Sequence, residues 1–171
     1  MFVPGAGTPA AIVYGKILAV IRDEVQPVLK DLEVYAGDRP PANYGLELEV
    51  EGIRRAADTA DVKAFHLVGA SAGGLFSLAF AAKYPERLMS LALMEPVSMD
   101  RENWSPEERA GYSEIERIPD LPPDQRVPAL TRLLMPPGVK MPPAPPAPPP
   151  AWMANRPAGL EAIFKSWRGY S

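Results

Sequence analysis

One serine of the chain stands in a setting that suits nucleophilic chemistry. Gly69, Ser71 and Gly73 form a G-x-S-x-G pattern, directly after an apolar run at 65–68 and directly before an apolar helical run. A serine in a sharp turn between strand and helix needs nearly side-chain-free neighbours two positions away. Its hydroxyl then projects above the sheet at a helix N-terminus, where backbone N–H groups favour developing negative charge. The pattern therefore predicts a nucleophilic serine at position 71.

A serine nucleophile needs a base within hydrogen-bond reach, at about 2.6–3.2 Å. The chain has a single histidine, His66, which lies on the same expected strand as Ser71. Five residues at about 3.3 Å each separate the two by about 16 Å. His66 is therefore predicted to be a core or sheet-end histidine with satisfied hydrogen bonds, and not the base.

The composition excludes several other kinds of site. The 171 residues include no cysteine, which rules out a disulfide framework, a zinc ribbon, an iron–sulfur site and a cysteine nucleophile. A net charge of −3 gives no electrostatic reason to bind nucleic acid or an anionic membrane. With 47% hydrophobic residues, the chain can bury a sizeable core without such staples.

Residues 1–95 alternate strand-like and helical runs. Strands and helices in strict alternation are typical of a parallel sheet with helices on its faces, so we expect an α/β fold with a partial parallel sheet. The expected elements are strands at 2–3, 28–35, 65–68 and 88–94, and helices at 9–23, 45–60 and 75–84.

Residues 96–171 hold most of the 22 prolines and no convincing strand. Ser105 and Pro106 begin an expected helix as N-cap and first residue, and further helices are expected at 124–134 and 158–168. The segment 136–150 should run as extended polyproline II, which suits a rigid linker between helices or a ligand for an SH3 or WW domain.

The G-x-S-x-G pattern and the turn Phe2-Val3-Pro4-Gly5-Ala6-Gly7 together resemble the α/β-hydrolase family. In that family the turn usually reads His-Gly-x-Gly, and here Pro4 replaces the histidine. The resemblance implies that the backbone N–H groups of Ala6 and Ala72 form an oxyanion hole beside Ser71. It offers Glu95 as the acid, although Glu95 also fits a sheet-end carboxylate that lines the pocket.

The same resemblance implies hydrolysis of a carboxylic ester or similar acyl compound through an acyl-serine intermediate. It implies no metal or organic cofactor, a small and hydrophobic substrate, a core at 1–95 and a helical cap at 96–171. The family takes its histidine from a loop after the eighth strand, so we expect a fragment that lacks the base and is truncated at both ends. A catalytically inactive fragment or a binding module is the alternative, and acyl transfer also stays open.

Three further expectations follow from the sequence. Gly5-x-Gly7-x-x-Ala10 fits a dinucleotide fingerprint weakly, because the strand before it is very short and Asp31 lies beyond the usual spacing of the acidic residue. The chain shows no secretory signal and no membrane span, so a cytoplasmic protein is expected. Truncation would expose sheet edges, which predicts self-association.

Overall fold

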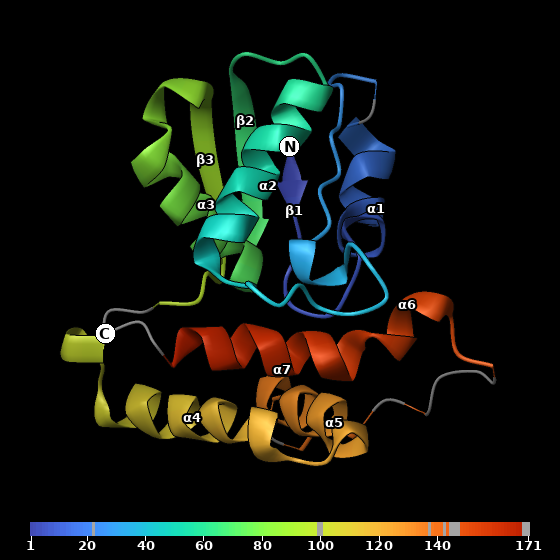
Figure 1. Cartoon of the computed structure of the whole chain (residues 1–171), viewed down its shortest axis with the longest axis vertical. Helices are drawn as coiled ribbons and strands as arrows, with labels where there is room; N and C mark the ends of the chain where they lie inside the picture. The colour runs from blue at the N-terminus through green and yellow to red at the C-terminus, as the bar shows by residue number, and fades with distance from the viewer. Residues whose placement is uncertain (22, 99–100, 137, 142, 144–147, 169–171) are drawn as a thin grey trace.

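The structure is a computed structural model that describes residues 1–21, 23–98, 101–136, 138–141, 143 and 148–168. Its sheet has three parallel strands in the order β1-β2-β3, namely β1 (Phe2–Val3), β2 (Phe65–Ala70) and β3 (Leu88–Met94). Because all three strands are parallel, their carboxyl ends meet at one edge of the sheet, which faces the C-terminal helices in Figure 1. The expected α/β class with a partial parallel sheet is confirmed.

Helices cover the sheet because alternate residues of β2 point to opposite faces. Val68 and Ala70 pack with Phe2 against α1 (Ala10–Ile21). Phe65 and Leu67 join the larger buried cluster, to which two other helices contribute: α2 (Leu46–Thr59) and α3 (Ala72–Lys83). The three helices lie within a residue or a few residues of the predicted ranges.

The expected strand at 28–35 is largely wrong. Only Leu29 pairs with the sheet, in a bridge to Phe2, and residues Glu33–Tyr35 form a short 3-10 helix, η1. The reason is a buried carboxylate: Glu49 of α2 accepts hydrogen bonds from the amides of Glu33 at 2.9 Å and Val34 at 3.3 Å. These amides are therefore satisfied by a side chain instead of a neighbouring strand.

The second half of the chain is helical, as predicted. Ser105 accepts a hydrogen bond from the Glu108 amide, and the Glu108 carboxylate accepts one from the Ser105 amide, so the predicted helix start is a full capping box. A short 3-10 helix, η2 (Pro85–Arg87), precedes β3. The helices after β3 are η3 (Arg101–Asn103), α4 (Pro106–Arg117), η4 (Ile118–Asp120), α5 (Pro123–Leu134), α6 (Ala151–Ala154) and α7 (Arg156–Trp167).

The last helix, α7, lies between the sheet domain and the pair α4 and α5 (Figure 1). Gly159 of α7 packs so closely on the Tyr35 ring that a Cβ there would overlap the ring atoms. An ion pair of 2.6 Å between the buried Arg126 and the half-buried Glu161 joins α5 to α7. One side of α7 is apolar and buried, through Leu160, Ile163, Phe164 and Trp167.

Two expectations from the sequence, the polyproline II conformation of 136–150 and self-association, stay predictions. Much of the proline-rich segment, at 137, 142 and 144–147, lies outside the described residues, so its polyproline II conformation stays a prediction. Apolar side chains are exposed along α1, where Val20 is 80% exposed, and on β3, where Met89 is 64% exposed. Self-association through such surfaces stays a prediction as well.

Candidate active site

Ser71 occupies the turn that joins β2 to α3. Its φ of 50° and ψ of −120° lie in a region that non-glycine residues rarely adopt. The turn is held by backbone hydrogen bonds, because the Ser71 amide donates to the Met94 carbonyl at 2.9 Å and the Gly74 amide donates to the Ser71 carbonyl at 2.9 Å. A strained backbone fixed in this way is a common property of functional turns.

The two glycines of the motif allow the chain segments to approach closely. A Cβ at Gly69 would lie 2.6 Å from the Gly73 carbonyl oxygen, and one at Gly73 would lie 2.6 Å from the carbonyl oxygen of Val3. Side-chain Cβ atoms essentially never come so near. The end of β1 and the first turn of α3 are therefore in contact only because position 73 has no side chain.

The loop after β1 lies directly against the serine. A Cβ at Gly5 would be 3.1 Å from the Ser71 Cβ, so the next residue, Ala6, is adjacent to the turn. On the other side, the buried Ala72 begins α3, and the first amides of a helix have no partner within it. Ser71 thus precedes Ala72 and lies against the loop that holds Ala6, the two residues that the family resemblance offered for the oxyanion hole; that role stays a prediction.

Glu95 follows β3, and residues on either side of it are hydrogen bonded to the backbone of Ser71. The Met94 carbonyl accepts the Ser71 amide, and the Val97 amide donates to the Ser71 carbonyl at 3.3 Å. Glu95 is exposed and has a φ of 46°, which makes it another strained non-glycine residue at this edge. Its role as an acid stays a prediction.

The only histidine is elsewhere on the sheet. His66 lies near the start of β2, is exposed, and its Nδ1 is 2.8 Å from the Ser90 Oγ on β3. It is therefore satisfied, as expected, but by a neighbouring strand at the surface and not within the core. No second imidazole can reach Ser71, because the sequence contains none.

The start of α1 is occupied in a way that weakens the dinucleotide interpretation. The Asp31 carboxylate accepts a hydrogen bond of 2.6 Å from the Ala10 amide, the first residue of α1. A pyrophosphate would bind at that same helix start. Asp31 already takes the Ala10 amide, so a pyrophosphate would have to displace this carboxylate from the helix start.

The comparisons with known proteins agree with this geometry. A family model described as alpha/beta hydrolase fold matches residues 37–120, which include the Ser71 turn. This chain has the α/β-hydrolase fold. No curated protein matches the chain.

Solved structures with the α/β-hydrolase fold superpose on nearly the whole chain. A hydrolase from Pseudomonas aeruginosa PA01 aligns with a TM-score of 0.71 and 17% identity, over 99% of this chain and 64% of that one. An esterase from a marine microorganism gives 0.60 and 15%, over 97% and 67%. A structure from work on carboxylesterases of Nitrososphaera gargenis gives 0.61 and 12%, over 99% and 63%. The chain thus spans less than two thirds of the first of these.

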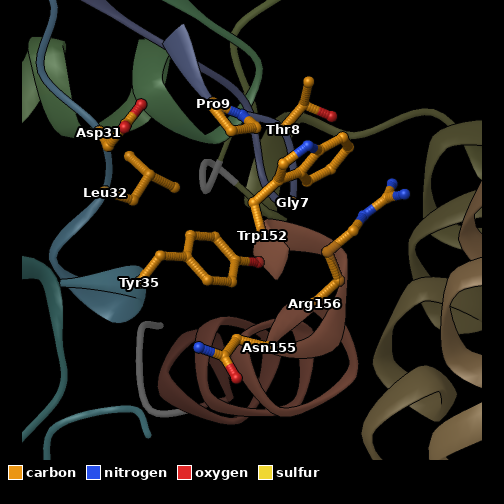
Figure 2. Close-up of a pocket in the computed structure, with 9 residues that line it drawn as sticks. All are labelled: Gly7, Thr8, Pro9, Asp31, Leu32, Tyr35, Trp152, Asn155 and Arg156. Carbon is orange, nitrogen blue, oxygen red and sulfur yellow. The ribbon is translucent and has the colours of Figure 1, made fainter. Parts of the chain in front are cut away.

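Within this α/β-hydrolase fold, Tyr35, Asn155 and Arg156 are residues that the sequence did not single out. Together with Trp152 and the loop that follows β1, they line a cavity (Figure 2). A glycine in that loop, Gly7, has a φ of 86° and lies against Arg156. The lining residues come from distant parts of the chain, so no local sequence pattern connects them. Gly7, whose left-handed backbone favours glycine, is the one residue that could have indicated a special position there.

In the described part of the chain, His, Asp and Glu side chains form no group of three that could hold a metal ion. None of the helices there combines the length and hydropathy that crossing a bilayer requires.

Proposed function

We propose that this chain carries the nucleophile and oxyanion part of a serine hydrolase for carboxylic esters or similar acyl compounds. The observation that carries the proposal is the strained Ser71 turn, between the carboxyl end of the central parallel strand β2 and the start of α3. Similar folds in an esterase and a carboxylesterase structure support the reaction class.

The reaction proceeds in two steps. Ser71 Oγ attacks the carbonyl carbon while a base takes the hydroxyl proton, and the backbone N–H groups of Ala6 and Ala72 hold the oxyanion. The bond to the leaving alcohol then breaks, and the alcohol departs with that proton. Water attacks the acyl-serine in turn, releasing the carboxylic acid and restoring the serine.

The base is the role that no described residue fills. His66 is hydrogen bonded to Ser90, and a well-placed general base contributes about 10²–10⁴-fold to the rate. We therefore propose that this chain by itself turns over p-nitrophenyl esters at no measurable rate. The pairing of its one histidine with Ser90 also supports the alternative, a non-catalytic module that keeps a small-molecule site.

A fluorophosphonate probe tests the assignment, with labelling located by peptide mass spectrometry. Imidazole in the buffer can replace the absent base, so we expect slow labelling at Ser71 that imidazole accelerates at least about tenfold. Ser71→Ala should abolish the label. Ser90→Ala is the matched control, because Ser90 is the serine with an imidazole in reach, and it should label like the unaltered chain.

Other outcomes would refute parts of the proposal. A label on Ser90, or labelling that survives Ser71→Ala, would overturn the nucleophile assignment. Absence of any label with imidazole present would favour the non-catalytic module. Rapid Ser71-dependent ester turnover without imidazole would show that the base is within this chain.

A further inference from the structure

A cavity of about 110 Å³ lies between the loop after β1 and the start of α7. It can hold several waters or a small organic molecule, because one water needs only about 10–15 Å³ of such space. Leu32 and Trp152 supply apolar walls, and Tyr35 and Arg156 supply polar groups (Figure 2).

Two buried polar atoms on this cavity have no hydrogen-bond partner among the described residues. They are the Tyr35 hydroxyl and the Arg156 Nε. Buried donors are nearly always satisfied in native proteins, so a pair of unsatisfied ones calls for a partner that binds there. In Figure 2 the Tyr35 hydroxyl points across the cavity toward the side where Trp152 and Arg156 lie.

Both donors border the same small volume. The position that a Cβ of Gly7 would occupy is 3.2 Å from the Arg156 Nε and 3.7 Å from the Tyr35 hydroxyl oxygen. The space between the two groups is therefore open because Gly7 has no side chain, and its φ of 86° disfavours any other residue.

The charge of Arg156 is also uncompensated within the described part of the chain. It forms no ion pair there, and its guanidinium carbon lies over the Trp152 ring, 5.3 Å from the ring centroid. Burial lowers the pKa of Arg156 and raises the pKa of Tyr35. Asp31 also lines the cavity, but its carboxylate is engaged by the Ala10 amide.

A single guanidinium beside a hydroxyl matches a carboxylate, which Arg can bind through two parallel hydrogen bonds. The apolar walls suit the hydrocarbon part of such a ligand. The distance to the serine is short, because Gly5 contacts Ser71 and Gly7 contacts Arg156. Two residues of chain span at most about 7.6 Å between Cα atoms.

We propose that Arg156 and Tyr35 form a carboxylate subsite, and that the substrate is a half-ester of a short dicarboxylic acid. The free carboxylate would lie on Arg156 while the ester carbonyl lies at Ser71. The assignment of the ester group rests on the proposed function, whereas binding of the carboxylate does not depend on it.

Calorimetric titration of the chain with monomethyl adipate tests the subsite, with dimethyl adipate as the uncharged comparison. We expect the half-ester to bind at least about tenfold more tightly than the diester, because a charge-assisted pair is lost in the latter. The Nε–Hε signal of Arg156 in a ¹H–¹⁵N spectrum should shift on addition of the half-ester.

Variants locate the effect. Arg156→Gln should weaken half-ester binding by about 10–100-fold, and Tyr35→Phe by about 3–10-fold. Arg117→Gln is the matched control, since Arg117 is exposed on α4 and paired with Glu114, and it should bind normally. Tyr35→Phe removes a hydroxyl that has no partner, so its fold should be at least as stable and loss of binding there cannot come from unfolding.

Equal binding of half-ester and diester, no detectable binding, or unchanged binding by Arg156→Gln would overturn the subsite. Inorganic phosphate that competes at Arg156 better than the half-ester would overturn the carboxylate class. If Ser71 fails to label while the half-ester binds, the proposed function fails and the subsite stands. If Ser71 labels and the half-ester does not bind, only the substrate class is wrong.

Discussion

Replacing Gly73 by alanine tests whether the contact between β1 and α3 holds the Ser71 turn. The new Cβ would lie 2.6 Å from the Val3 carbonyl oxygen and 2.9 Å from the Val3 carbonyl carbon, and closer still to the Pro4 carbonyl oxygen. Ordinary Cβ contacts lie at 3.4–4 Å. Because these are backbone atoms that cannot rotate away, the end of β1 has to move.

Data on overpacked protein cores bound the change in the free energy of unfolding that this overlap causes. Extra methyl groups in tight sites destabilise proteins by about 1–3 kcal/mol. Alanine in place of a helical glycine recovers about 0.5–1 kcal/mol of this. The difference of these two terms lies between about 0 and 2.5 kcal/mol. Because the overlap is with backbone atoms, we expect Gly73→Ala to lower the free energy of unfolding by about 1–2.5 kcal/mol, measured by urea denaturation and circular dichroism.

Gly15→Ala in α1 is the matched control, because no atom lies within 4 Å of a Cβ at that helical position. It should raise the free energy of unfolding by about 0.5–1 kcal/mol. Gly73→Ala should also slow imidazole-assisted labelling of Ser71 by about tenfold or more, since displacement by 1 Å is enough to misplace the Ala6 amide. Equal stabilities of the two variants would refute the argument.

Two further predictions concern the fold. Ser105→Ala removes the capping box of α4 and should lower the free energy of unfolding, measured in urea, by about 1 kcal/mol. Ser113→Ala is the control, because it removes only an exposed hydrogen bond to a carbonyl of the same helix, and its free energy of unfolding should lie within about 0.5 kcal/mol of that of the unaltered chain. Equal effects would contradict the capping argument. Burial raises the pKa of Glu49 above its ordinary value of 4.5. The contribution of Glu49 to the free energy of unfolding is therefore complete at low pH and is lost as the pH rises through the folded-state pKa. Denaturation midpoints at pH 5 and pH 7 should therefore differ less in Glu49→Gln than in the unaltered chain, and an unchanged pH difference would contradict this.

Local patterns predicted the parts of the fold that local physics controls. The apolar run at 88–94 became β3 with the same bounds, and the Ser105 motif became the start of α4. The G-x-S-x-G spacing also predicted a tight strand-to-helix turn, and Ser71 has the strained backbone that such a turn requires. Each of these features depends on residues that are close in sequence.

Features that depend on distant contacts were not predicted. Residues 28–35 look like a strand by composition, but the carboxylate of Glu49 takes the amides that a strand partner would have taken. The spacing of α2 held a clue, because Glu49 lies four residues before Ile53 and so on the buried face. Tyr35 and Arg156 meet only through the tertiary fold, and no local pattern connects them.

The position of α7 has a consequence for how the protein is made. Tyr35 and the buried cluster that includes Leu32 and Val34 are covered by residues up to Trp167. At about 5–20 residues per second, a ribosome needs roughly 7–27 s to reach Trp167 after it has added Val34. During that interval the nascent chain exposes the apolar surface that α7 later covers, and we expect this surface to be open to chaperone binding until α7 has been made.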